Sequence, residues 1–238
     1  MVAAQRFFID NDLLRRLTAD GNGLALQADG RIVQAGVGMI GTTQDFVAVR
    51  YNTDGSLDTG FSGDGIVTTP IGTSFDIAQS VAVQADGKIL VGGYYTNGSN
   101  NDFALVRYTS AGALDTSFGG GDGIATLDFA SGLDAAWGLA VQPDGKILLS
   151  GSASSDMALA RFLTDGTPDT SFSGDGRWTA HLGGNSILYA TALTGDGRIV
   201  GTGYTTVGGT DDVLTIRLAA DGTPDVRANP SGSSLGGS

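Results

Sequence analysis

Short apolar runs separated by Asp-Gly turns repeat four times along this chain. The turn reads Gln84-Ala85-Asp86-Gly87-Lys88-Ile89, and its Asp recurs at positions 29, 86, 144 and 196, which are 57, 58 and 52 residues apart. Asp-Gly between two apolar runs predicts a β-hairpin, because both central residues of a type I′ turn need positive φ. A repeat of this length sets the architecture of the whole chain.

Each repeat carries four predicted strands in the same order. The first precedes the turn, the second follows it, the third begins at an Asp, and the fourth follows a Gly-Asp-Gly turn. The first strands include 24–26, 81–83, 139–141 and 191–193, and the third strands are 45–51, 102–108, 156–162 and 212–218. The fourth strands are 66–69, 124–127 and 178–180, and the last repeat stops before its own.

The second strand closes on a glycine seven residues after the turn Asp, at Gly36, Gly93, Gly151 and Gly203. A recurrent strand glycine indicates either a bulge with close backbone approach or simple packing, and we favour packing.

The third strand carries an Arg five residues after its Asp, so the two side chains lie on opposite faces. The Arg therefore needs another partner. A turn-rich corner follows the third strand, at 54–61, 111–118, 165–172 and, cut short, 221–225. We expect the Asp of this corner, or a turn carbonyl between repeats, to bind Arg50, Arg107, Arg161 and Arg217.

Four antiparallel strands per unit of about 55 residues predict an all-β fold, a β-propeller of four-stranded blades. Thirty-nine glycines and the absence of Glu agree with many turns and few helices. The predicted divisions are an N-terminal segment 1–21, repeats at 22–72, 73–130, 131–183 and 184–226, and a flexible tail 227–238.

Three arrangements of these units remain open. Residues 5–9 would supply the missing outer strand and close a four-bladed ring, or two chains would form an eight-bladed ring. Residues 13–21 also look like a degenerate copy of the third strand, which would make the N-terminus the remnant of another blade.

The sequence segments 83–89, 102–108 and 114–119 resemble the delta-60 repeat. This resemblance covers roughly residues 20 to 225. It implies a propeller from a family of bacterial extracellular or surface proteins without a defined general function, and it carries no catalytic or ligand motif.

The net charge of −12 argues against nucleic acid as a partner, because phosphate binding needs a basic surface. There is no cysteine, and no apolar run approaches the length of a membrane span. No signal peptide is visible, so we expect either an exported chain whose leader was removed or a cytoplasmic one.

Little in the sequence points to catalysis. The one histidine, His181, occupies the repeat position of Pro70 and Asp128, three residues after Trp178, and is expected to be a surface residue. No Gly-x-Ser-x-Gly elbow is present. The Gly-Asp-Gly turns are interpreted as structural, so no cofactor is predicted, with calcium kept as the alternative.

The repeats differ most just before the first strand. The positions two residues before it hold Asn22, Gln79, Trp137 and Tyr189, and three residues earlier lie Asp76 and Asp134. If the first strand lines a central channel, these side chains surround its mouth and suit a polar ligand such as a sugar or peptide. The alternative is that they are ordinary loop residues.

The leading hypothesis is therefore a non-enzymatic scaffold or binding module for an extracellular protein or glycan. A calcium-dependent propeller hydrolase of the lactonase or phosphotriesterase type is the alternative. A self-assembling unit, or a fragment of a longer surface protein, is the third hypothesis. The repeat-breaking residues Trp137, Tyr189, Trp178 and His181 are the positions most expected to carry function.

Overall fold

The computed structural model describes residues 20–129 and 132–225, and within these ranges the protein consists of fifteen strands without a helix. Three antiparallel sheets have four strands and the last has three, which confirms the predicted all-β blades. Within the described ranges the chain has no helix of the length and hydrophobicity needed to cross a membrane.

The strands of each blade follow one another in sequence order. The first blade holds β1 (Asp20–Leu26), β2 (Ile32–Ile40), β3 (Thr43–Tyr51) and β4 (Ile66–Thr69). The second holds β5 (Asp76–Val83), β6 (Ile89–Thr96), β7 (Asn101–Tyr108) and β8 (Ile124–Leu127). The third holds β9 (Asp134–Val141), β10 (Ile147–Ala153), β11 (Asp156–Phe162) and β12 (Arg177–Ala180), and the fourth holds β13 (Ser186–Leu193), β14 (Ile199–Val207) and β15 (Thr210–Leu218).

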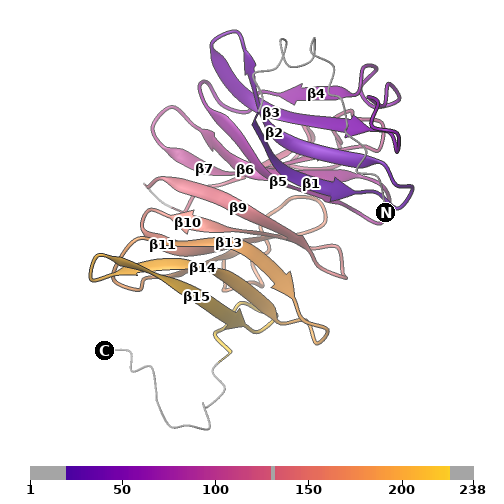
Figure 1. Ribbon diagram of the computed structural model, residues 1–238. Coiled ribbons are helices and arrows are strands. Elements are labelled where there is room, and N and C mark those ends of the chain that lie inside the picture. Colours follow the sequence, from indigo (N-terminus) through magenta and orange to yellow (C-terminus); the bar gives the residue numbers. More distant parts are fainter. Residues whose placement is uncertain (1–19, 130–131, 226–238) are drawn as a thin grey trace, which may run out of the picture.

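The blades stack face to face in chain order, with the first and fourth at opposite ends of the stack (Figure 1). The outer surfaces of these two end blades expose large apolar side chains, namely Leu24 and Leu26 on β1 and Val213 on β15. The predicted closing strand at 5–9 lies outside the described residues. Of the predicted N-terminal segment, Asp20 and Gly21 form the start of β1.

Three buried apolar clusters fill the spaces between neighbouring blades. Each combines strands of two neighbouring blades, as Phe46 on β3 does with Ala78 on β5 and Val91 on β6 in the first cluster. The other two clusters repeat this arrangement around Leu149 and Leu188. The alternating pattern of the strands thus produces one apolar layer per pair of blades.

The third-strand arginines link each blade to the next in the manner the sequence predicts. Arg107 is 5 % exposed, and its Nε donates to Asp115 Oδ2 at 2.8 Å while its Nη1 donates to the carbonyl of Thr164 in the following blade at 2.5 Å. The guanidinium also lies 4.3 Å from the ring centre of Phe118. Both expected partners, corner Asp and turn carbonyl, are confirmed here.

The same linkage recurs at Arg50 and Arg161. Each pairs with the corner Asp of its own blade and donates to a turn carbonyl of the next, at Ser110 and Ala220. In the fourth blade Arg217 pairs with Asp225 at 2.7 Å but is 40 % exposed.

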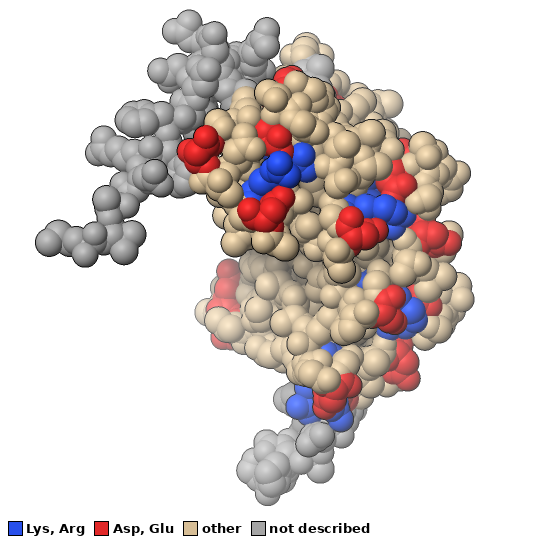
Figure 2. Space-filling model, turned by 90° about the vertical axis from the view of Figure 1, so that its right-hand side faces the viewer, with Lys and Arg blue, Asp and Glu red and all other residues tan. Residues whose placement is uncertain are grey.

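The Asp-Gly hairpins add a second cation to each corner Asp. Lys146 of one hairpin lies 3.1 Å from Asp169, the carboxylate already paired with Arg161. Burial acts to raise the pKa of Asp169, but hydrogen bonds from Ser171 and the two cations outweigh it and lower this pKa to about 2. Figure 2 shows red and blue groups repeated down the face that carries the hairpins.

The strand glycines face β-bulges, which corrects our preference for simple packing. In the pairing of β9 with β10, Gly151 lies opposite Ala136 and Ser150 lies opposite Gly138, so one residue of β9 is left over. A Cβ at Gly151 would lie 1.9 Å from the carbonyl oxygen of Ala135. Only glycine fits, because the bulge draws the two backbones together.

Candidate functional site

The four residues predicted at a channel mouth are the extra residues of four equivalent bulges. The register of the first strand shifts in each blade at the position these residues occupy, which is Asn22, Gln79, Trp137 or Tyr189. A bulge redirects the side chain of its extra residue, so the repeat presents one variable side chain per blade at an equivalent place.

Two of these side chains form part of a continuous aromatic row. The rings of Trp137 and Tyr189 are 5.7 Å apart between centroids and meet at 77°. Tyr94 lies 6.2 Å from Trp137 on one side, and Tyr204 lies 5.8 Å from Tyr189 on the other. These four residues, from the second, third and fourth blades, are called the aromatic row below.

The other two bulge residues support neighbouring groups. Asn22 donates through Nδ2 to the carbonyl of Ala78 in the next blade at 2.9 Å. Gln79 is half-buried and hydrogen-bonds the hydroxyl of Tyr94, so it holds one end of the row. The predicted set is therefore brought together in part, with the aromatic members in mutual contact.

The sequence interpretation missed Tyr94 and Tyr204. Both follow directly after the repeated strand glycine, where the other two blades have Val37 and Ser152. The residue at this position varies from blade to blade, as does the bulge residue on the paired strand. This shared variation was a usable signal in the sequence. Tyr94 pairs with Ile77, two residues from the bulge residue Gln79.

The row combines partial burial with solvent access. Tyr189 is 48 % exposed, and Tyr94, Trp137 and Tyr204 are half-buried. Burial raises the pKa of Tyr94, and burial followed by the neighbouring Tyr204 raises the pKa of Tyr189. Both phenols are therefore neutral hydrogen-bonding groups at physiological pH. The indole Nε1 of Trp137 has no hydrogen-bond acceptor among the described residues.

Asp76 and Asp134 occupy equivalent positions as the first residues of β5 and β9, and both are 1 % exposed. Asp76 accepts hydrogen bonds from the backbone N–H groups of Ile71 and Gly72 and so closes the loop before its strand. Burial raises the pKa of both carboxyls.

Trp178 and His181, the last two residues predicted to carry function, make no ring contact with the aromatic row. Trp178 lies on β12 and packs against the apolar cluster between the third and fourth blades. His181 lies just after β12, largely exposed, with its Nδ1 2.6 Å from Asp156 Oδ1. His181 thus pairs with the Asp that opens the third strand of its own blade.

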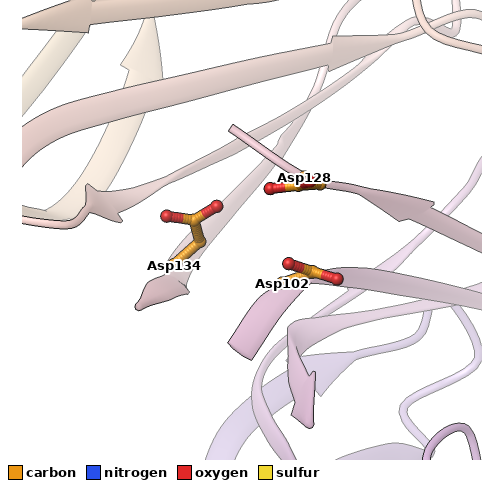
Figure 3. A group of neighbouring side chains, drawn as sticks. All are labelled: Asp102, Asp128 and Asp134. Atoms are coloured by element: carbon orange, nitrogen blue, oxygen red, sulfur yellow. The ribbon is translucent and has the colours of Figure 1, made fainter. Parts of the chain in front are cut away.

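Three carboxylates meet between the second and third blades, at Asp102, Asp128 and Asp134 (Figure 3). One oxygen from each lies within 4.8 Å of the others. Asp102 and Asp134 are buried and Asp128 is exposed. Carboxylate oxygens are the ligands that calcium prefers, so this group is the metal-binding candidate of the described residues.

Several solved structures resemble this chain at low sequence identity. A catalytically inactive variant of virginiamycin B lyase from Staphylococcus aureus, solved with quinupristin, gives a TM-score of 0.46 at 13 % identity, over 86 % of this chain and 57 % of that one. A putative gluconolactonase gives 0.44 at 11 % identity, over 86 % and 61 %. A PL25 ulvan lyase gives 0.44 at 14 % identity, over 85 % and 53 %.

The chain thus spans between about half and three fifths of the length of these structures. Likeness of this size transfers no activity. Among curated proteins, no sequence matches this chain.

A family model does match, once in every blade. The family is described as a domain of unknown function (DUF5122) beta-propeller, and the matched residues are 27–61, 84–118, 142–172 and 194–227. These stretches contain the Asp-Gly hairpin, the third strand and most or all of the corner that binds its arginine, and together they cover more than half of the sequence. The chain belongs to the DUF5122 beta-propeller family.

Proposed function

We propose that this protein is a non-enzymatic binding module that holds a neutral glycan across the aromatic row. The observation that carries the proposal is the unbroken contact of Tyr94, Trp137, Tyr189 and Tyr204 across three blades. A row of solvent-accessible rings at a repeat-breaking position is a feature that the packing of the blades alone does not require.

The chemistry of the row suits a sugar chain. The π faces of Trp and Tyr are electron-rich and attract the polarised C–H groups of a sugar ring, and the phenol hydroxyls supply hydrogen bonds. Pockets for small polar ligands combine apolar surface with a few directed polar groups in the same way. Because adjacent rings are 5.7–6.2 Å apart, an extended ligand can contact more than one ring at once.

The charge of the chain favours a neutral ligand over an anionic one. The sequence has a net charge of −12, so a sulfated or uronic-acid polymer would be repelled over much of the surface. An extracellular or cell-surface location is part of this proposal. Its support is the resemblance to the delta-60 repeat, together with the chemistry of the ligand.

A glycan array tests the proposal directly, with a peptide array as its counterpart. We expect retention of neutral oligosaccharides by the wild-type chain. We also expect Trp137→Ala to weaken binding about ten-fold or more, because truncating an aromatic anchor costs about 2 kcal/mol. Phe75→Ala is the matched control, since Phe75 is an aromatic residue 53 % exposed with no ring contact to the row.

Three results would overturn the proposal. Retention of peptides alone would make the module a protein binder, and equal loss from the Phe75 and Trp137 variants would remove the row from the site. Turnover of a lactone or phosphotriester substrate would replace the binding module with the hydrolase alternative.

A further inference from the structure

The carboxylates of Asp102, Asp128 and Asp134 come from three separate segments that meet between two blades. Asp102 is the second residue of β7, Asp128 follows β8, and Asp134 is the first residue of β9 in the next blade. One oxygen of each lies within 4.8 Å of the other two. Figure 3 shows the three carboxyl groups gathered at one place. Like charges at this distance repel one another unless a cation or a proton lies between them.

Two of these carboxylates have an oxygen that nothing in the described chain satisfies. Asp102 is 3 % exposed and Asp134 is 1 % exposed, and the Oδ1 atom of each is shielded from solvent without a hydrogen-bond donor. Their Oδ2 atoms accept hydrogen bonds from Asn97 and from the backbone of Phe129. A buried carboxylate oxygen without a donor is costly unless a cation, a water molecule or a proton compensates it.

No basic side chain of the described residues forms an ion pair with Asp102 or Asp134. Arg177 donates through Nε to the main-chain carbonyl of Asp128 at 2.8 Å. The two buried carboxylates therefore face each other without a protein counter-charge.

The equivalent place between the first and second blades is different. Pro70 stands where the second interface has Asp128, so only two carboxylates remain, Asp45 and Asp76. Both oxygens of Asp76 accept backbone N–H groups, from Ile71 and Gly72. That interface is satisfied by the chain itself.

The polar groups at the equivalent place between the third and fourth blades are also paired with protein groups. His181 replaces Asp128 in the repeat and lies 2.6 Å from Asp156, the equivalent of Asp102. Ser186 replaces Asp134, and its hydroxyl is hydrogen-bonded to Thr205 at 2.7 Å. Among the three described interfaces, the three-carboxylate arrangement occurs at the second alone.

We propose that Asp102, Asp128 and Asp134 bind a calcium ion that links the second and third blades. Calcium binds oxygen ligands at about 2.3–2.6 Å, so ligands on opposite sides of the ion are about 4.6–5.2 Å apart. The observed spread of up to 4.8 Å fits this without rearrangement. Magnesium demands near-octahedral geometry at about 2.0–2.1 Å and keeps several of its waters, so a group of three carboxylates suits it less well.

The exposed carboxylate supplies the route for the ion. Asp128 lies at the surface, so an ion reaches it first and then contacts the two buried carboxylates. Solvent on the same side provides the remaining ligands, since calcium takes about six to eight oxygens.

The test is calorimetric titration of chelator-treated protein with CaCl₂, together with the melting temperature in CaCl₂ and in EGTA. We expect one site per chain and a rise of about 5 °C at saturating calcium, because ligand binding stabilises the folded state. Asp128→Asn is the informative variant because Asp128 is exposed, so the variant should fold. It should weaken calcium binding at least ten-fold.

Asp76→Asn is the matched control, because it changes the equivalent of Asp134 at an interface without the third carboxylate. Its affinity for calcium should equal that of the wild type. The proposal would be overturned if the titration gave no heat of calcium binding and the melting temperature did not change. Equal loss from both variants, or equal binding of MgCl₂, would overturn the assigned site or its calcium preference.

Discussion

The indole ring of Trp137 meets the phenol ring of Tyr189 almost edge-on, at 77° and 5.7 Å between centroids, although the two residues belong to different blades. Each is the extra residue of a β-bulge in the first strand of its blade. The repeat therefore uses an identical backbone device to place different side chains side by side. This is how a structural repeat produces a surface that differs from blade to blade.

The bulge itself should be sensitive to its opposing glycine. Gly151→Ala is expected to destabilise the protein by about 1–3 kcal/mol, because the new Cβ would lie 1.9 Å from the carbonyl oxygen of Ala135. The displaced bulge should also change the fluorescence of the adjacent Trp137. Urea unfolding and emission spectra measure both effects.

Gly195→Ala is the control for this variant. No heavy atom lies within 4 Å of a Cβ at Gly195, so its unfolding free energy and emission spectrum should match the wild type. Equal stability of the Gly151 and Gly195 variants would show that the close approach at the bulge is not needed.

The interblade arginines should dominate stability. Arg107→Met leaves Asp115 buried at 7 % exposure without its main partner and removes the hydrogen bond to the carbonyl of Thr164. Loss of one partner of a buried ion pair costs about 3–5 kcal/mol. Chemical denaturation should show a decrease of this size.

Arg217→Met is the matched variant in the fourth blade. Arg217 pairs with Asp225 in the same way but is 40 % exposed, so its loss should cost less than about 1 kcal/mol. If the two variants lose equal stability, burial is not what makes the linkage strong.

The corner carboxylates predict a loss of stability in acid. The pKa of Asp169 is lowered to about 2, and that of Asp58 is also lowered, in each case against the opposing effect of burial. The folded state therefore releases these protons more readily than the unfolded state, whose Asp pKa is about 3.9. The stabilisation is fully present above about pH 4 and is lost as the pH falls towards 2.

Urea midpoints measured between pH 5 and pH 2 test this sign. Asp169→Asn should make the dependence on pH shallower, since one of the low-pKa groups is gone. Asp76 has a raised pKa and contributes with the opposite sign, so Asp76→Asn should not flatten the acid limb. A wild-type midpoint that stays constant from pH 5 to pH 2 would contradict the prediction.

The hairpins, the blades and the Asp partners of the arginines could be predicted from the sequence because each depends on residues close together within one repeat. Asp-Gly specifies its turn locally, and Arg107 lies eight residues from Asp115. Alignment of the repeats also identified Trp137 and Tyr189 as unusual. These are consequences of local geometry and of repetition.

Contacts between blades were harder to predict. Tyr94 joins the row because the second blade packs against the third at a particular offset, which the order of strands does not specify. Asp102, Asp128 and Asp134 occupy three different positions of the repeat unit, so an alignment of the repeats does not bring them together. Their convergence follows from how the end of β8 enters the next blade.

The most direct test of the central claim is the fluorescence of Trp137 during titration with the neutral oligosaccharide that the array selects. The protein has two tryptophans, so Trp178→Phe leaves Trp137 as the only indole emitter. The predicted result is a saturable change in emission. Tyr189→Ala should raise the dissociation constant measured in this way about ten-fold, and Phe75→Ala should leave it unchanged. Binding confirmed by calorimetry with no change in Trp137 emission would place the ligand elsewhere and contradict the account.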